Sequence, residues 1–281
     1  MLYTTLMKTL KNILTKDILE YEYANCKDIS KISEKLKISK DSIRKYIKLY
    51  NIKYYKYQPK IYSCNNNIFY KENENAFYLA GFIAADGCVR NRVRKKCISK
   101  SLIIALSNKD HEHLEKIKMA LQSNNPIKSI IIKPNKKVKV YSHQSRIEIY
   151  SAQIVNDLLK FNITPNKTYT YNMPDWLINH ELVNHFIRGY FDGDGSIGKY
   201  KKPPSKILHS QLNMLGTELF IKQYKTIIEQ NCNVNDNKII KINNIYSLSY
   251  SGNNVVKRIY EFLYKDATIY LDRKKDKFKQ H

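Results

Sequence analysis

The chain of 281 residues is long enough for two or three domains, and its 43% hydrophobic content is sufficient for well-packed cores. Lysine and arginine number 49 against 25 aspartate and glutamate residues, which gives a net charge of +24. This excess predicts a polyanionic partner, and because no stretch is apolar enough to span a membrane, we expect a nucleic acid and exclude a membrane role.

The sequence has five cysteines without close paired spacing: Cys26, Cys64, Cys88, Cys97 and Cys232. This scatter is typical of reduced thiols in an intracellular protein and argues against a disulfide framework or a zinc site. The basic N-terminal stretch leaves a mitochondrial presequence open, although it lacks arginine. The heavy use of Lys, Asn, Ile and Tyr indicates an AT-rich genome, which fits a mitochondrion or plastid, a phage-infected cell and a bacterial cytoplasm equally well.

Residues 1–58 are predicted to form a helix-turn-helix. Apolar residues recur at helical spacing in two runs on either side of a break at 38–39: Ile29, Ile32 and Leu36, then Ile43, Ile47 and Tyr50. Ser39 or Asp41 would cap the second helix. Its outward side chains are the candidate DNA contacts: Lys40, Ser42, Arg44, Lys45 and Lys48. The alternative is a basic helical hairpin that serves only for packing. Residues 59–74, with Pro59 and the asparagines of 65–67, are predicted to be a linker.

One element then occurs twice, as FYLAGFIAADGCV at 77–89 and FIRGYFDGDGSI at 186–197. Gly81 precedes Asp86 by five positions, and Gly189 precedes Asp194 by five as well. If both runs are helical, a small residue four positions after each of these glycines leaves one helix face almost bare, so the two backbones can approach closely.

Each helix is predicted to end in a left-handed cap at the glycine after its aspartate, Gly87 or Gly195. Asp86 and Asp194 would then lie side by side, where they repel each other and also meet the negative ends of two helix dipoles. A divalent cation relieves this conflict, and Mg²⁺ suits carboxylates at a partly open site. A single Asp-Gly is more typical of a buried helix with a glycine turn, but duplication in the same register favours the metal site.

These two stretches strongly resemble the motifs of the single-chain LAGLIDADG homing endonucleases. Residues 79–87 spell the first motif with two departures, at Phe82 and Ala84, and residues 187–195 spell the second more loosely. Both copies keep the acid before the final glycine, which carries the metal in that family. The resemblance therefore implies a site for Mg²⁺, or another divalent cation such as Mn²⁺, at four residues: Asp86, Asp194, Gly87 and Gly195.

After each motif the pattern predicts the order hairpin, helix, hairpin, helix. In the first unit, 75–165, this gives strands within 89–108, a helix opened by Asp110, strands at 127–133 and 137–151, and a helix at 152–161. His111 and His113 lie two apart on different helix faces, so we interpret them as the polar start of that helix and not as metal ligands.

The second unit, 181–281, follows an inter-unit linker at 166–180. Its predicted strands are 196–202, 206–214, 238–242 and 246–251, with a helix at 217–230 capped by Thr217 and a last helix at 253–264. Pro203 and Pro204, and later Asn243 and Asn244, mark the turns. The fold class is therefore α/β (α+β), with two pseudo-symmetric α-β-β-α-β-β-α units whose sheets line a basic saddle. Polar positions on the sheet faces are candidate DNA contacts: Gln144, Arg146, Gln211 and Asn213.

Hydrolysis of a phosphodiester also needs a positive group near the scissile phosphate. The segments ITPNKT at 163–168 and IYLDRKKDK at 269–277 resemble those that carry an active-site lysine in related family members. By this resemblance Lys167 and Lys274 join Asp86 and Asp194 as catalytic residues. Because the chain has 49 basic residues, the alternative for each lysine is a solvated charge.

The resemblance implies a monomeric, site-specific endonuclease that binds a long site in double-stranded DNA, bends it and cuts both strands across the minor groove, leaving 3′ overhangs. Nothing resembles an intein splice junction, so we expect an intron-encoded or free-standing gene and a role in intron mobility. Two alternatives remain open. One is a maturase that binds intron RNA on the same fold. The other is a transcription regulator that no longer cuts, although binding alone would not need two crowded aspartates.

Overall fold

The computed structural model describes residues 13–26, 28–52, 62–94, 97–134, 140–201 and 208–279. The chain divides into two compact units, Met1–Ile61 and Tyr62–His281. Each unit has its own hydrophobic core. In the described ranges, no helix has both the length and the apolar character needed to cross a membrane.

The smaller unit contains helices α2 (Lys16–Cys26), α3 (Ile29–Leu36) and α4 (Lys40–Leu49), which close around a core that includes Leu19, Ile32 and Ile43. The two predicted helices are present, and Ser39 caps α4 by accepting a hydrogen bond from the Ser42 amide at 3.2 Å. Helix α2 was missed by the sequence analysis. Its apolar residues point both inward and outward, since Leu19 is buried while Tyr21 is 66% exposed, and the helical period is therefore obscured.

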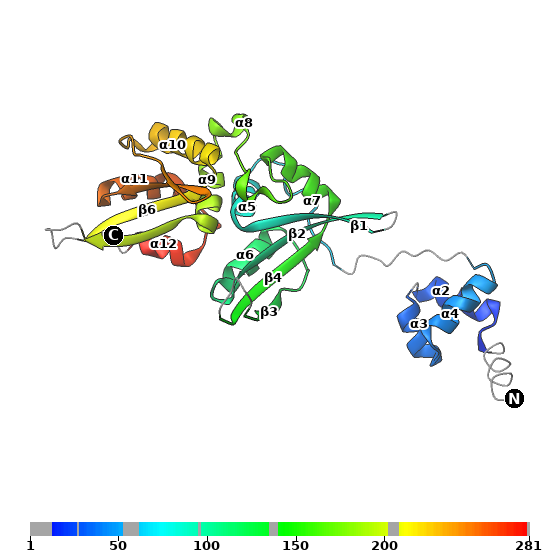
Figure 1. Cartoon of the computed structure of the whole chain (residues 1–281). Helices are drawn as coiled ribbons and strands as arrows, with labels where there is room; N and C mark the ends of the chain where they lie inside the picture. Colours follow the sequence, from blue (N-terminus) through cyan, green and yellow to red (C-terminus); the bar gives the residue numbers. More distant parts are fainter. Residues whose placement is uncertain are drawn as a thin grey trace. The chain divides into compact units, whose positions relative to one another are not determined.

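The larger unit contains two four-stranded antiparallel sheets with the same strand order. The first runs β1-β2-β4-β3, with bounds Gly87–Arg94, Cys97–Ser107, Ser142–Tyr150 and Lys128–Ile132 in that order. The second runs β5-β6-β8-β7, with bounds Ser196–Lys201, Leu208–Gly216, Ile245–Ser251 and Ile240–Ile242. The sheets lie on either side of a central pair of helices (Figure 1). This repeated topology confirms the predicted fold class and its pseudo-symmetry.

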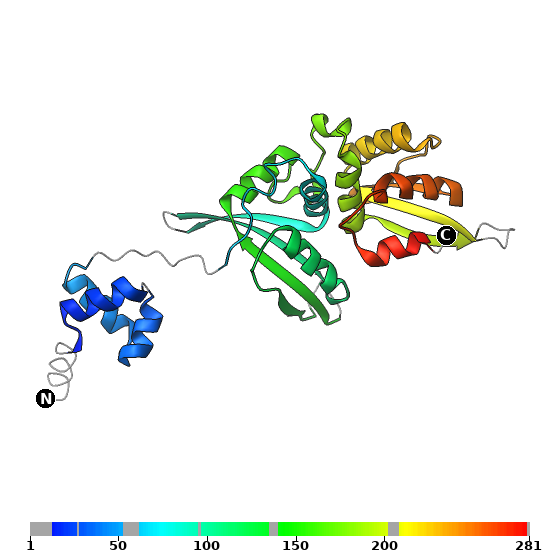
Figure 2. The same cartoon turned by 180° about the vertical axis from the view of Figure 1, so that it is seen from behind.

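Helices cover one face of each sheet (Figure 2). Helices α6 (His111–Ala120) and α7 (Ala152–Asp157) pack on the first sheet, and α10 (Glu218–Cys232) and α11 (Asn253–Tyr264) pack on the second. Short 3-10 turns, Asn108–Asp110 and Leu158–Phe161, flank α6 and α7, and another at Lys167–Tyr169 precedes the short helix α8 (Asp175–Ile178). As predicted, the Thr217 hydroxyl caps α10 by accepting from the Phe220 amide at 3.2 Å.

The prediction that 253–264 is the last helix was wrong, because α12 (Asp272–Lys279) follows it. Its sequence is almost entirely charged, and Phe278 is its one apolar residue, so the sequence has no apolar periodicity that would predict a helix there. Phe278 packs against Phe191 and Tyr260, with ring centroids 5.7 and 5.1 Å apart. Asp110, predicted to open α6, makes no side-chain cap there and instead binds Arg273 of α12 at 2.6 and 2.9 Å.

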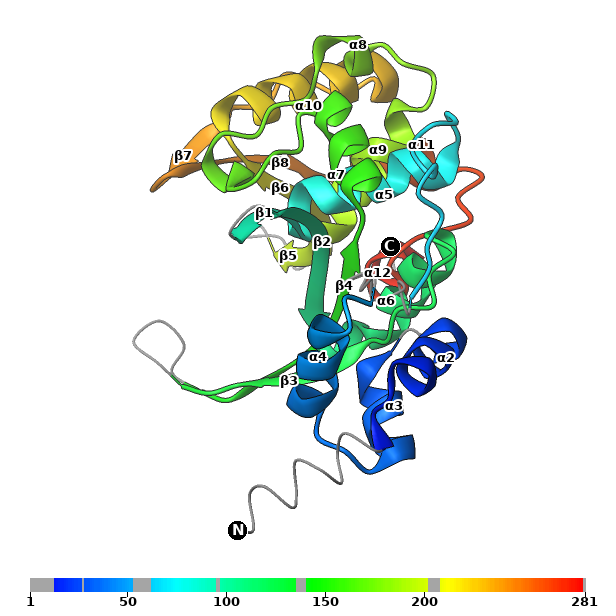
Figure 3. The same cartoon turned by 90° about the vertical axis from the view of Figure 1, so that its right-hand side faces the viewer.

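The central pair consists of α5 (Glu74–Asp86) and α9 (Val183–Asp194), which lie side by side (Figure 3). A Cβ atom on Gly81 would lie 1.9 Å from the Phe186 carbonyl oxygen, and one on Gly189 would lie 2.0 Å from the Tyr78 carbonyl oxygen. No larger residue fits at either position. The predicted close approach of the two helix backbones is therefore confirmed.

The predicted left-handed caps at Gly87 and Gly195 were wrong. Their φ angles are −80° and −78° with extended ψ, and the chain passes directly from each helix into the next strand. Glycine is needed there for space: a Cβ on Gly87 would lie 2.6 Å from the Ile83 Cγ2 atom, and one on Gly195 would lie 2.1 Å from the Phe191 Cδ2 atom.

The predicted turn at Pro203 and Pro204 and the first three residues of the predicted linker, 59–61, lie outside the described residues. The rest of that linker packs on the larger unit. Phe69 is buried there with its ring centroid 6.2 Å from that of Phe161, and the Asn65 amide donates to the Leu121 carbonyl at 3.0 Å. This part of the chain is therefore fixed by apolar packing and backbone hydrogen bonds.

Candidate active site at the ends of the central helices

The two motif aspartates are the last residues of the central helices, Asp86 in α5 and Asp194 in α9. The helix ends meet so closely that a Cβ on Gly193 would lie 2.4 Å from the Ala85 Cβ and 3.6 Å from the Asp86 carboxyl carbon. Both aspartates reach solvent. The fold therefore brings one carboxylate from each repeat to a single accessible point.

Both predicted lysines are buried beside these helix ends. Lys167, 7% exposed, donates from Nζ to the Gly87 carbonyl oxygen at 2.7 Å. Lys274, 4% exposed, donates to the carbonyl oxygens of Phe191, Asp192 and Gly193 at 2.7, 2.8 and 3.0 Å. Carbonyls in the last turn of a helix have no partner within it, so Lys274 satisfies the C-terminus of α9 and opposes its dipole. Neither lysine is a solvated surface charge.

The four charged groups influence one another. Burial and the neighbouring Asp86 carboxylate raise the pKa of Asp194 to about 6, against the opposite effect of Lys167 and Lys274. Burial also raises the pKa of Asp86 against the effect of the same two lysines. Burial lowers the pKa of Lys274 to about 8 and that of Lys167 in the same direction. The two halves therefore contribute to one electrostatic cluster.

The donors at this point fit a hard divalent cation. The described part of the chain has no group of three or more His, Cys, Asp or Glu side chains placed to hold a metal. A cation at Asp86 and Asp194 would thus complete its coordination with water and phosphate oxygens, which is the usual pattern for Mg²⁺. Gly87 was a predicted metal ligand, and its carbonyl oxygen already accepts a hydrogen bond from Lys167. The cation and Lys167 would therefore share this oxygen.

Asp192, to which the sequence analysis gave no role, is 1% exposed and does not point at the cation position. Its carboxylate accepts three hydrogen bonds of 2.8 Å, from the Tyr78 hydroxyl, the Tyr264 hydroxyl and the Leu271 amide. The available signal was a second acid, two residues before Asp194 and directly after the apolar pair Tyr190 and Phe191. The Tyr78 hydroxyl also lies 3.0 Å from His113 Nε2, so the buried hydrogen-bond network around Asp192 extends to His113.

The prediction that His113 belongs to the polar start of its helix was wrong, because the His113 side chain is buried and only 2% exposed. Burial lowers its pKa to about 4, so the imidazole is neutral at physiological pH. His111 lies nearer the surface and its Nδ1 atom is 2.9 Å from the Ser145 hydroxyl. Both histidines are therefore held within the protein's own hydrogen bonds.

The polar residues predicted for the first sheet lie on its uncovered face. Gln144 and Arg146 alternate along β4 with buried Ile147 and Ile149, which face the helices. Arg146 donates to the Glu148 carboxylate at 3.0 Å and lines a cavity of about 280 Å³ on this face. Sequence reasoning missed two arginines of β1, Arg90 and Arg92, which alternate with buried Val89 and therefore share the uncovered face.

In the second sheet, Gln211 and Asn213 of β6 alternate with buried Leu212 and Met214 in the same way. The Asn213 Oδ1 atom accepts from the hydroxyls of Ser247 and Ser249 at 2.7 and 3.0 Å, so part of this amide is used within the sheet.

In the smaller unit, the polar positions predicted for α4 are mostly exposed: Lys40, Arg44, Lys45 and Lys48. Arg44 is paired with Asp41 at 2.8 Å, and the Ser42 hydroxyl lies 2.8 Å from that of Ser39. Ser42 thus contributes to the start of the helix. DNA recognition by this unit stays a prediction.

Part of the chain matches a family model, and the chain is similar to solved structures. A model of the LAGLIDADG-like domain matches residues 73–160. The homing endonuclease I-WcaI, solved bound to its DNA recognition sequence, is 18% identical over 73% of this chain and 85% of its own, with a TM-score of 0.54. The LAGLIDADG homing endonuclease I-LtrWI, solved bound to target DNA, is 15% identical over 77% of this chain and 90% of its own, with a TM-score of 0.49. A search of curated proteins gave no match.

Proposed function

We propose that this chain, which contains a LAGLIDADG-like domain and has the fold of the LAGLIDADG homing endonucleases, makes metal-dependent double-strand breaks in DNA at a long recognition site. The proposal rests on one observation. Asp86 and Asp194 meet at the same end of the central helix pair, and a buried lysine lies beside each helix end. Two accessible carboxylates, with a buried lysine beside each, would supply one acid and one positive group for each of the two DNA strands.

Duplex DNA is the substrate that the surroundings of this site favour. The uncovered faces of the two sheets bear arginines and amides, among them Arg90, Arg146 and Gln211, and the whole chain has a net charge of +24. The structurally similar I-WcaI was solved with its DNA recognition sequence. Because one chain supplies both motif aspartates, we propose a monomer.

A bound divalent cation, Mg²⁺ or Mn²⁺, would neutralise phosphoryl oxygens and make the attacking water more acidic. Asp86 and Asp194 would hold it through their carboxylate oxygens. Lys274, with a pKa of about 8, is mostly protonated at neutral pH, so it would stabilise the negative charge that develops on the phosphate and would not act as a base. Lys167 would have the same role in the other half.

The test is cleavage of a randomised or host-genome DNA library by the purified full-length protein in Mg²⁺, with new ends mapped by sequencing. The control is the double variant Asp86→Asn, Asp194→Asn, which keeps the shape of both side chains and removes the two carboxylates. We expect discrete paired ends with 3′ overhangs from the wild type only, and similar DNA affinity for both proteins. Tight binding without cleavage by the wild type would contradict the proposal and would favour a role in RNA splicing or in transcription control.

A further inference from the structure

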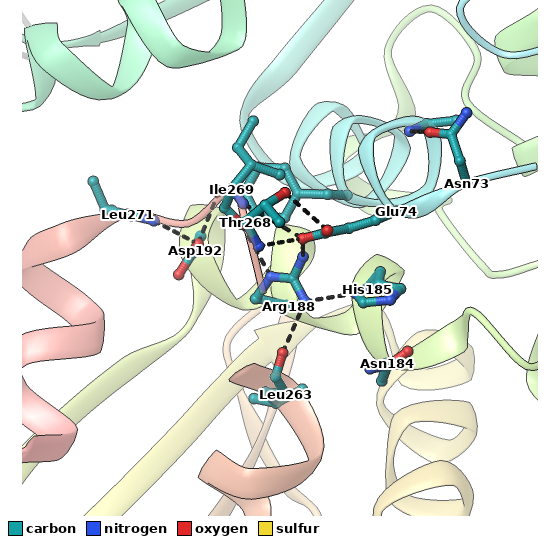
Figure 4. Close-up of polar contacts among 12 residues, drawn as sticks. Asn73, Glu74, Asn184, His185, Arg188, Asp192, Leu263, Thr268, Ile269 and Leu271 are labelled. Atoms are coloured by element: carbon teal, nitrogen blue, oxygen red, sulfur yellow. Dashed lines mark hydrogen bonds and ion pairs between the residues drawn. The ribbon is translucent and has the colours of Figure 1, made fainter. Parts of the chain in front are cut away.

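The segment that carries Lys274 to the active site is held by an unusual concentration of buried charge. This segment, residues 263–274, links the end of α11 to the start of α12. Charged side chains of both central helices hold its backbone (Figure 4). Lys274 is one turn beyond the last of these contacts.

Arg188 of α9 is fully buried and lies at the centre of this arrangement. Its guanidinium donates to the Leu263 carbonyl at 2.9 Å and to the Ile269 carbonyl at 3.1 Å. The same group is paired with Glu74 at 2.7 Å, so its charge is compensated within the protein. Arg188 thereby fixes two points of the segment that leads to α12.

Glu74 and Asp192 fix further points. The Glu74 carboxylate accepts from the Thr268 amide at 2.7 Å and from the Thr268 hydroxyl at 2.8 Å. Asp192 accepts from the Leu271 amide at 2.8 Å. Leu271 in turn accepts from the amide of Lys274 at 3.0 Å, so a chain of direct contacts runs from Asp192 to the catalytic lysine.

The other half lacks this arrangement. When the two motifs are aligned on their glycines and aspartates, Ala80 and Ala84 of α5 stand opposite Arg188 and Asp192 of α9. The segment that carries Lys167 is positioned by buried Ile163 and by a 3.3 Å hydrogen bond from the Tyr171 hydroxyl to the Phe161 carbonyl. Pseudo-symmetric catalytic lysines are therefore held by different means.

We propose that Asp192, Arg188 and Glu74 are positioning residues for Lys274 alone, so that weakening them slows the cut of one DNA strand and leaves the other. The strand-specific part rests on the proposed endonuclease function. The positioning of Lys274 does not depend on the endonuclease function, because this part of the proposal concerns the protein without DNA.

The first test follows the two strands of a cleavage site separately, with a different fluorophore on each. Lys274→Ala and Lys167→Ala first identify which strand depends on which lysine. We expect Asp192→Asn and Glu74→Gln to slow the Lys274-dependent strand by about tenfold to a hundredfold, as for a displaced catalytic group, and the other strand by less than about twofold. Glu72→Gln is the matched control, since Glu72 lies two residues before α5, is exposed, and contacts only His180, at 3.3 Å, among the ion pairs of the described residues. Equal slowing of both strands would overturn the proposal.

The second test needs no cleavage. The free protein is treated with a lysine-acylating reagent, and the labelling rates of Lys274 and Lys167 are measured by mass spectrometry at a temperature where both variants remain folded. We expect the reactivity of Lys274 to rise at least about fivefold in Asp192→Asn and Glu74→Gln, because its amine is no longer held against the helix carbonyls. Unchanged labelling of Lys274, or a parallel rise at Lys167, would refute the positioning role. If the wild type cuts no DNA, this measurement still decides whether Asp192 and Glu74 position Lys274.

Discussion

At the scale of single residues, the two aspartates of the candidate active site are placed where their charge is unfavourable. Burial and the Asp86 carboxylate together raise the pKa of Asp194 to about 6, from an ordinary value of 3.8. Between these two values the folded protein binds more protons than the unfolded chain, so Asp194 makes folding less favourable as the pH rises through about 6. A protein keeps such a charge where it serves binding or catalysis.

We therefore expect Asp194→Asn to raise the thermal midpoint by more at pH 8 than at pH 5, because the cost of ionising Asp194 in the folded protein grows between its ordinary pKa of 3.8 and its folded pKa of about 6 and is complete only above that range. Thermal unfolding in metal-free buffer at both pH values measures this. Added Mg²⁺ should raise the midpoint of the wild type at pH 8 and not that of the variant. A variant less stable than the wild type at pH 8 would show that the lysines outweigh the repulsion.

At the scale of elements, the two central helices depend on glycines that let their backbones touch. Each glycine faces a backbone carbonyl of the partner helix, so a side chain there would push the two backbones apart and open the packing between them. The same contact fixes the separation of the two aspartates at the helix ends. Packing and site geometry are thus set by the same residues.

Gly189→Ala should accordingly destabilise the fold by about 3 kcal/mol, the upper part of the range for overpacked cores. Gly198→Ala is the control, because Gly198 lies in β5 and a Cβ added there would meet nothing within 4 Å, so its effect should stay within about 0.5 kcal/mol. Denaturant unfolding of the two variants compares them. Equal stabilities would mean that the helices can separate without cost.

At the scale of the whole molecule, the two units have separate cores, and the proposed catalytic residues all belong to the larger one. Exposed basic residues of α4 give the smaller unit a surface suited to phosphate contacts. We propose that the smaller unit adds affinity for DNA while the larger unit cuts it.

Removal of residues 1–61 should leave the thermal midpoint of the larger unit unchanged and weaken DNA binding by about tenfold or more. Because each phosphate contact contributes about 0.9 to the salt dependence, the slope of log affinity against log salt should fall by about 2 to 4. Cleavage of DNA that is already bound should keep nearly its full rate. An unchanged affinity and slope would assign the smaller unit a role in packing only.

The sequence by itself determined the repeat, the glycine-lined helix pair and the α/β topology, because these follow from local spacing: small residues four apart, alternation in strands and polar caps such as Thr217. It also pointed to Asp86 and Asp194 by their position within the repeat, and to Lys167 and Lys274 through the resemblance of their segments to those of LAGLIDADG family members. It was wrong about the caps at Gly87 and Gly195 and about the last helix, since close packing and a mostly charged helix leave no local pattern. Only the tertiary structure decided the partners of Arg188, Asp192 and Glu74, because the groups that compensate a buried charge come from segments far apart in the chain.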